Sequence, residues 1–179
     1  MRIDSQGWLS GGDYIHSPNF DDRPDVAIEL LVLHNISLPP SEFGGEGVLR
    51  FFSNTLDQAE HPFYASIAEL RVSAHFFVRR DGQIIQFVSC LKRAWHAGES
   101  SWQGKSRCND FSIGIELEGS DFVPFDAAQY EALHNLTVAL RETYPIRGIA
   151  GHCDIAPQRK TDPGPCFDWV RYLAGLCKQ

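Results

Sequence analysis

The strongest strand signal in the chain is an almost unbroken apolar run from Glu29 to Ile36 (ELLVLHNI). Its length and its β-branched members predict a buried central strand. A second segment, Phe111 to Glu118, alternates, so its odd-numbered apolar residues share one face. The even-numbered positions Ser112, Gly114, Glu116 and Glu118 share the other face. The small residues beside Glu116 leave room for another group to sit over the strand, and we expect Glu118 to be exposed at an edge.

A β-hairpin is predicted between these two strands. Ala74 to Arg80 and Gln83 to Ser89 flank the dipeptide Asp81-Gly82, which is favoured in two-residue turns whose central residues both need positive φ. Upstream, the proline and glycine residues between Pro39 and Gly47 predict a long irregular loop. A short helix over roughly Val48 to Leu56 should follow this loop.

The C-terminal third of the chain predicts two helices and a short strand. Asp126 with Gln129 resembles a capping box, and apolar residues then recur at helical spacing until Tyr144-Pro145 ends the helix. Gly148 to Asp154 is compatible with a short strand, Pro157 to Pro165 with a loop, and Cys166 to Lys178 with a closing helix. We therefore predict one domain over residues 1–179, of mixed α/β (α+β) class, with a central mixed β-sheet flanked by helices.

Composition narrows the possible partners. The 179 residues carry a net charge of −7, which argues against a general nucleic-acid binder because such a protein needs a basic face. Arg71, Arg107 and Lys160 could still form a local basic pocket for an anionic small molecule. We expect a monomer whose partner is a small-molecule substrate.

The sequence also predicts the compartment. Met1 to Phe20 contains no apolar run that could act as a secretory signal, and no stretch is long and apolar enough to cross a bilayer. The five cysteines are odd in number and form no CxxC pair, so we expect reduced thiols. These features predict a cytoplasmic protein without membrane association.

Three residues could form a metal site. His34 lies near the end of the first predicted strand, His152 at the end of a short apolar stretch, and Asp162 in the proline-rich loop. Two imidazoles and one carboxylate would leave a fourth position open for water, as in catalytic zinc sites. Taken alone, each histidine could equally be a packed or surface residue, and Asp162 could belong to a turn. The sequence has no HExxH motif, which would place two metal ligands on one helix.

Glu116 is the stronger local signal for chemistry. A carboxylate on an apolar strand is costly unless it is paired or used, and desolvation would raise its pKa toward that of a general base. An exposed position is the alternative. Lys160 lies two residues before Asp162 and could reach the same site, or it could be a surface lysine. His75 alternates with Phe77, which favours core packing, and an extended Cys153 would be a buried thiol pointing away from His152.

Five segments together resemble a known family. LVLHNIS (31–37), SAHFFVRRDGQIIQFV (73–88), AWHAG (94–98), NDFSIGIELEG (109–119) and GHCDIAPQRKTDPGPCFDW (151–169) are similar to the AmpD-type branch of the N-acetylmuramoyl-L-alanine amidases. The segments occur in the family's order over nearly the whole chain, and the last is the most specific.

The resemblance implies both a fold and a set of roles. The fold would be a central mixed sheet flanked by helices with zinc in a surface groove. His34, His152 and Asp162 match the positions that bind zinc, Glu116 the proton acceptor and Lys160 the transition-state stabiliser. The matching segments also place five residues near the substrate: Asn35, Arg71, Trp95, His96 and Arg107.

The resemblance implies an activity as well. The enzyme would hydrolyse the amide between the lactyl group of (1,6-anhydro-)N-acetylmuramic acid and L-alanine in cytoplasmic muropeptides. It would act in peptidoglycan recycling and would indirectly repress β-lactamase induction. Two alternatives are a non-catalytic muropeptide-binding receptor of the same fold and a zinc-free thiol hydrolase that uses Cys153 and a histidine. The complete set of implied zinc and catalytic residues argues against the receptor.

Overall fold

A computed structural model describes residues 1–176 and contains a six-stranded mixed sheet with the strand order β1-β5-β4-β9-β3-β10. The strands of this sheet are β1 (Asp13–Tyr14), β3 (Leu30–Ile36), β4 (Phe76–Val78), β5 (Ile84–Gln86), β9 (Ser112–Glu118) and β10 (Gly148–Gly151). Two small sheets pair β2 (Phe20–Asp22) with β6 (Lys92–Ala94) and β7 (Ser101–Trp102) with β8 (Lys105–Ser106). The helices are α1 (Gly47–Phe52), α2 (Pro62–Ile67), α3 (Ala127–Thr143), α4 (His152–Ile155) and α5 (Trp169–Leu176), with a 3-10 turn at Cys108–Asp110. The predicted fold class, a mixed sheet flanked by helices, is confirmed.

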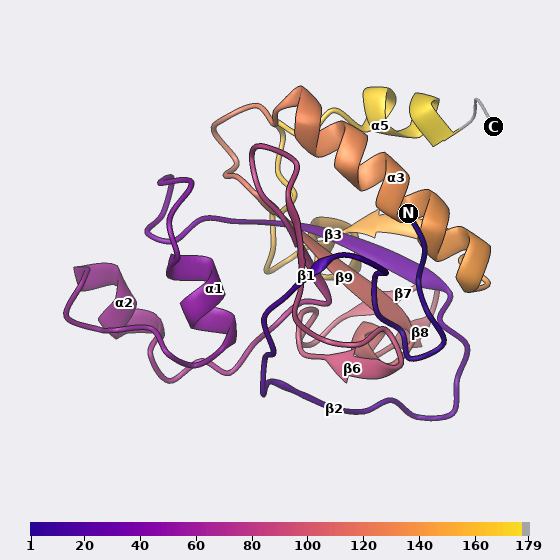
Figure 1. Cartoon of the computed structure of the whole chain (residues 1–179), viewed down its shortest axis with the longest axis horizontal. Helices are drawn as coiled ribbons and strands as arrows, with labels where there is room; N and C mark the ends of the chain where they lie inside the picture. Colours follow the sequence, from indigo (N-terminus) through magenta and orange to yellow (C-terminus); the bar gives the residue numbers. More distant parts are fainter. Residues whose placement is uncertain (177–179) are drawn as a thin grey trace.

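The alternation within β3 and β9 separates two sides of the sheet. Ile113, Ile115 and Leu117 of β9 pack with Leu31 and Leu33 of β3 against α3 and α5. Figure 1 shows these two helices lying together over one side of the sheet. The side chains of Leu30, Val32, His34 and Ile36 therefore point to the opposite side, where the candidate site lies.

A second apolar cluster supports that opposite side. It joins α1 and α2 to β4 and β5 through buried residues that include Phe52, Tyr64, Phe77 and Phe87. Figure 1 shows α1 and α2 beside the sheet, away from α3 and α5. The prediction of a helix after the Pro39–Gly47 loop is confirmed, but α1 ends at Phe52, four residues earlier than expected.

The predicted hairpin between β4 and β5 forms with a different turn. Its strands pair antiparallel, with Val78 opposite Ile84. The backbone N–H of Gly82 donates to the Arg79 carbonyl, and that of Arg79 donates to the Gln83 carbonyl. Only Gly82 of the Asp81-Gly82 pair has a positive φ, +88°. The connection is thus a type I turn closed by a left-handed glycine, not the expected two-residue turn.

Three further expectations need correction. Glu118 is buried, because its carboxylate accepts the backbone N–H groups of Gly44 and Arg80. Residues 152–155 form α4, so Cys153 is helical rather than extended. The closing helix begins at Trp169, and the end expected at Lys178 lies outside the described residues.

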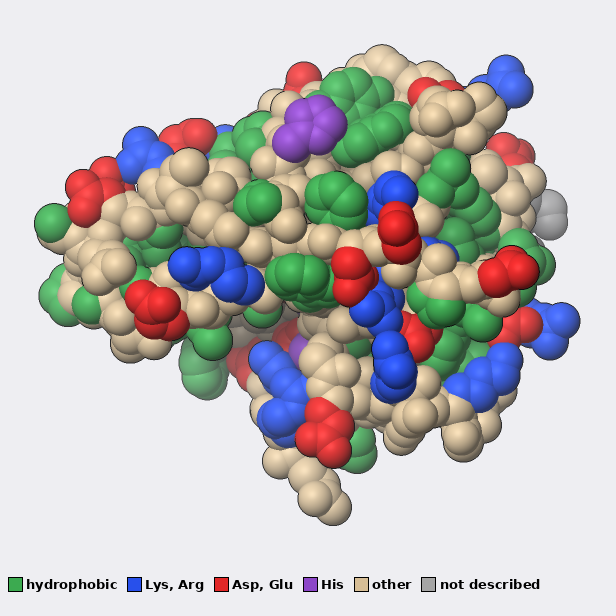
Figure 2. Space-filling model, turned by 90° about the horizontal axis from the view of Figure 1, so that it is seen from below, with side chains coloured by type: hydrophobic (Ala, Val, Ile, Leu, Met, Phe, Trp, Pro, Cys, Tyr) green, Lys and Arg blue, Asp and Glu red, His purple; other side chains and the backbone are tan. Residues whose placement is uncertain are grey.

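The helix over residues 127–143 matches its prediction closely. Gln129 accepts the backbone N–H of Asp126 in the expected capping box, and the helix ends before Pro145. Within residues 1–176, no helix has the length and apolar character needed to cross a membrane. Figure 2 shows acidic and basic side chains interspersed on the face seen from below, rather than a continuous basic area.

Candidate metal centre and groove

Three neighbouring parallel strands bring the site residues into one row. His34 of β3 lies directly opposite Glu116 of β9, so the two side chains share a face of the sheet. On the other side of β3, Gly151 of β10 pairs with Leu33, and His152 follows immediately. The row therefore forms at the carboxyl ends of parallel strands, where open α/β sheets commonly bind ligands.

Asp162 reaches this row from the loop that follows α4. The backbone N–H of Cys153 donates to the Asp162 carbonyl at 2.9 Å. The Asn35 side chain donates to the Pro163 carbonyl at 3.0 Å and to Asp121 Oδ1 at 2.8 Å. Asn35 thereby ties β3 to the two loops beside the site and fixes the Asp162 carboxylate over His34 and His152.

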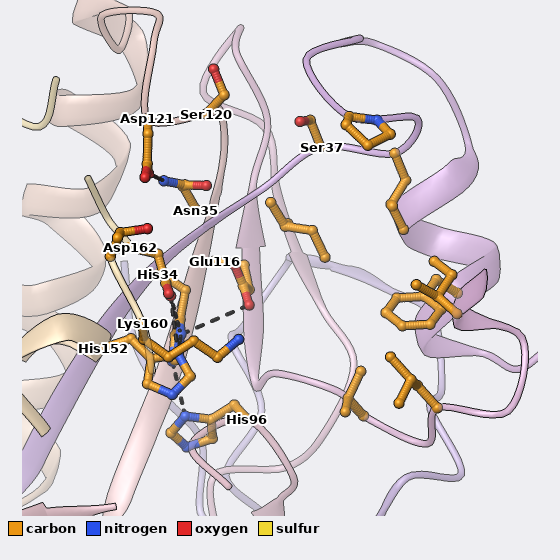
Figure 3. A pocket seen from close by; sticks show the side chains of 18 of the residues that line it. His34, Asn35, Ser37, His96, Glu116, Ser120, Asp121, His152, Lys160 and Asp162 are labelled. Atoms are coloured by element: carbon orange, nitrogen blue, oxygen red, sulfur yellow. Dashed lines mark hydrogen bonds and ion pairs between the residues drawn. The ribbon is translucent and has the colours of Figure 1, made fainter. Parts of the chain in front are cut away.

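Three electron-pair donors converge at this point. His34 Nδ1 lies 3.0 Å from His152 Nδ1 and 2.9 Å from Asp162 Oδ2, and His152 Nδ1 lies 3.1 Å from the same oxygen. His152 Nε2 faces the Ala97 carbonyl at 3.1 Å. Because a carbonyl can only accept, that nitrogen holds the proton of the neutral ring, and His152 Nδ1 presents a lone pair to the site. Lone pairs that converge on a carboxylate oxygen fit a bound cation (Figure 3).

The surroundings favour a neutral imidazole at His34. Burial lowers the pKa of His34 to about 4, more than the neighbouring Asp162 can offset. Burial opposes ionisation of Asp162 itself, but the close contacts of its carboxylate with the His152 and His34 rings hold its pKa well below its usual range. A neutral imidazole beside an ionised carboxylate is the ligand form that a divalent transition metal requires.

Glu116 stands next to the three converging donors. Its Oε1 atom lies 4.0 Å from His34 Nδ1, and the residue is 9% exposed. Its Oε2 atom is buried and has no hydrogen-bond partner among the described residues. Burial, followed by the charge of Asp162, raises the pKa of Glu116 well above its usual range, while Lys160 lowers it. Figure 3 shows the Lys160 side chain extending beside His34 toward Glu116.

The row opens into a groove of about 600 Å³. One wall is apolar and comes mainly from residues near α1 and α2, among them Leu38, Phe51, Phe63, Ile67 and Leu70. Phe122 lines the groove from the loop after β9 and is 84% exposed. The segments that resemble the family do not indicate this wall, because its residues lie outside them.

The five predicted substrate residues are placed differently. Asn35 and His96 line the groove, and His96 is buried. Arg71, Trp95 and Arg107 do not line it. The Arg71 guanidinium donates to the Ala68 and Leu70 carbonyls, and Arg107 pairs with Asp110. Their assignment as substrate contacts stays a prediction.

Cys153 has the properties of an ordinary thiol. Burial and the nearby Asp154 and Asp162 carboxylates raise its pKa, whereas a cysteine nucleophile needs a lowered one. His75 is fully buried, as expected for core packing, and accepts the backbone N–H of Gly114. The four cysteines within residues 1–176 are free. These observations disfavour a thiol hydrolase.

Comparison with known proteins links this geometry to one family. The family model described as N-acetylmuramoyl-L-alanine amidase matches residues 24–165. The chain is 56% identical over 177 residues to the 1,6-anhydro-N-acetylmuramyl-L-alanine amidase AmpD of Escherichia coli K12, with 97% of each chain covered.

Solved structures agree with this similarity. A selenomethionine derivative of AmpD superposes with a TM-score of 0.95 at 56% identity, covering 98% of this chain and 99% of that one. The amidase AmiD of Escherichia coli, solved with the substrate anhydro-N-acetylmuramic acid-L-Ala-D-γ-Glu-L-Lys, gives a TM-score of 0.60 at 34% identity. That match covers 83% of this chain and 57% of AmiD.

Proposed function

The chain belongs to the N-acetylmuramoyl-L-alanine amidase family, and we propose that it is a zinc-dependent enzyme acting on small muropeptides. It would cut the amide between the lactyl group of 1,6-anhydro-N-acetylmuramic acid and L-alanine. The observation that carries the proposal is the convergence of three lone-pair donors beside a buried carboxylate with a free oxygen, inside one groove. One domain over residues 1–179 would suffice for this activity.

His34, His152 and Asp162 would hold the zinc ion. Two nitrogens and one oxygen are a common ligand set for catalytic zinc, and this set leaves a coordination position free. When bound, zinc supplies Lewis acidity toward the scissile carbonyl and toward water. The protein side chains then have two tasks, which are to move protons and to stabilise the charge that develops on the carbonyl oxygen.

Glu116 is the proposed proton acceptor. Its unpartnered Oε2 can accept a hydrogen bond from a water molecule placed against the lactyl carbonyl. The raised pKa brings this carboxylate closer to the operating pH, where a general base is most effective. As the amide breaks, Glu116 would pass the proton to the alanine nitrogen, which leaves as an amine.

Lys160 is the proposed stabiliser of the oxyanion. Its ammonium group extends toward Glu116 in Figure 3 and would face negative charge on the attacked carbonyl. Removal of one such donor typically costs about a hundred- to a thousand-fold in rate. The charge of Lys160 also keeps the pKa of Glu116 from rising further, so the two residues act as a coupled pair.

The groove suits a short muropeptide. Its apolar wall can cover the lactyl methyl group and the less polar face of a sugar ring, while Asn35 and His96 lie on the polar side. We propose Arg71, Trp95 and Arg107 as contacts for parts of the substrate that extend beyond this groove. The similarity to relatives named for the anhydro sugar supports a preference for that sugar form.

The cellular role follows from the proposed substrate. A cytoplasmic enzyme with this preference would process recycled cell-wall fragments, and by removing them it would indirectly repress β-lactamase induction. The support is the 56% identity to AmpD over nearly the full length of both chains.

Product analysis tests the proposed function. Zinc-loaded and zinc-depleted protein would be incubated with an anhydromuramyl tripeptide, its reducing-sugar counterpart and intact murein. We expect free tripeptide from the anhydro substrate, slower release from the reducing sugar and no release after zinc depletion. Tight muropeptide binding without cleavage by the zinc-loaded protein would instead indicate a receptor.

A further inference from the structure

The loop from Trp95 to Gly98 lies against both histidines of the candidate metal site. It contacts each ring at Nε2, the nitrogen that faces away from the converging donors. His34 Nε2 lies 3.0 Å from His96 Nδ1, and His152 Nε2 lies 3.1 Å from the Ala97 carbonyl. Figure 3 shows the His96 ring next to His34 on the side away from Asp162. Two adjacent residues thus reach both imidazoles.

The direction of the His34 contact follows from a chain of hydrogen bonds. Ser112 Oγ lies 2.6 Å from the Cys108 carbonyl, and two oxygens at that distance need a proton that only the serine can supply. Ser112 Oγ therefore accepts from His96 Nε2, which lies 3.2 Å away. A neutral His96 then has its lone pair on Nδ1 and accepts the Nε2 proton of His34. This series of hydrogen bonds therefore leaves the lone pair of His34 on Nδ1, which faces the metal site.

The β9 strand makes room for the His96 ring. A Cβ atom at Gly114 would lie 2.4 Å from His96 Cγ and 2.6 Å from its Nδ1. Such distances are far below van der Waals contact, so the ring can rest there only against a glycine. Three residues on the same face of β9 therefore shape the site. Ser112 hydrogen-bonds His96, Gly114 leaves space for the His96 ring, and Glu116 lies opposite His34.

Two side chains from outside the loop fix its backbone. Asn109 Oδ1 accepts the backbone N–H groups of His96 at 3.2 Å and of Ala97 at 2.8 Å. The Arg159 guanidinium donates to the Ala97 carbonyl at 3.0 Å and to the Glu99 carbonyl at 2.7 Å. The Ala97 carbonyl that faces His152 is therefore held from two directions.

We propose that the loop Trp95–Gly98 is a shared positioning element that orients both metal-binding histidines with Nδ1 toward the metal. His96 and Asn109 are its positioning residues. The inference rests on the proposed zinc site and assigns to His96 a role beyond substrate contact. Partners that orient metal-bound histidines typically contribute about 10- to 100-fold in metal affinity or activity.

Zinc affinity, measured by competition with a chromophoric chelator, tests this role without using catalysis. His96→Leu keeps bulk but removes the acceptor, whereas His96→Asn places an amide oxygen near the position of Nδ1. We expect His96→Leu to weaken zinc binding about 10- to 100-fold and His96→Asn to restore much of the loss. Gln86→Leu is the matched control, because Gln86 is also buried and bonds backbone groups, but only near the N-terminus and β5.

The outcomes separate this proposal from the proposed function. Wild-type protein that binds no zinc would refute the zinc enzyme itself. Wild-type binding together with unchanged affinity in His96→Leu, or with equal losses in His96→Leu and His96→Asn, would overturn only the positioning role. If His96→Leu does not fold, nitrogen-15 NMR of metal-free wild-type protein decides. We expect the Nε2–H tautomer at His34 and His152, and an Nδ1–H tautomer at either would refute the proposal.

Discussion

Replacing Gly114 by alanine should weaken zinc binding although Gly114 is not one of the proposed zinc ligands. The added Cβ would lie 2.4 Å from His96 Cγ, so the ring must retreat by about 1 Å or more to reach ordinary contact. Its Nδ1 is now 3.0 Å from His34 Nε2, and a separation near 3.6 Å no longer counts as a hydrogen bond. Unless His34 follows, the contact is lost, and we expect about 10- to 100-fold weaker zinc binding.

Overpacking alone would also destabilise the fold, by about 1–3 kcal/mol. Gly148→Ala provides the matched control, because its Cβ would lie 2.3 Å from the Trp102 ring, which packs against the apolar cluster that includes Leu30, Val32 and Ile155. Chelator competition gives the zinc affinity of both variants, and thermal unfolding of the metal-free proteins gives their stability. We expect similar losses of stability but weaker zinc binding only in Gly114→Ala. Equal zinc affinities in the two variants would refute the reasoning.

Three further predictions concern residues at the site. His152→Ala should remove zinc, measured by elemental analysis, and abolish activity while the circular dichroism spectrum is retained; full zinc content would contradict the ligand assignment. Glu116→Gln should retain one zinc per chain and lose about 10²–10⁴ in kcat, the usual range for a general base, and near-normal kcat would reject that role. Lys160→Met should lower kcat about 10²–10³-fold. It should also move the acid limb of the pH–rate profile to higher pH, because Lys160 lowers the pKa of Glu116, which must be ionised to accept a proton. An unmoved acid limb would argue against this coupling.

The sheet and its site strands could be predicted because their signals are local. The apolar run at 29–36 and the alternation at 111–118 correspond to β3 and β9. Their parallel pairing, which puts His34 opposite Glu116, depends on tertiary structure and could not be read from either segment. The room predicted beside Glu116 exists, and the His96 ring occupies it.

Part of the difference between prediction and structure comes from partners that are distant along the chain. The prediction of an exposed Glu118 is wrong because its partners Gly44 and Arg80 lie far from it along the chain. Cys153 was expected in a strand, but the chain turns into α4 directly after Gly151. The apolar wall of the groove comes mainly from residues on and near α1 and α2; the helix that became α1 was predicted, but its place beside the site was not. Contacts between remote segments decide the burial of Glu118 and the position of the apolar wall.

Hydrolysis in water enriched with oxygen-18 tests the central claim most directly. Zinc-loaded protein would be incubated with a 1,6-anhydro-N-acetylmuramyl tripeptide, and both products would be weighed by mass spectrometry. Attack of water on the lactyl carbonyl predicts one heavy oxygen in the lactyl carboxylate of the released sugar and none in the tripeptide. It also predicts that the reaction stops on zinc removal and resumes when zinc is restored. Heavy oxygen in the peptide, cleavage at another bond or full activity without metal would contradict the account.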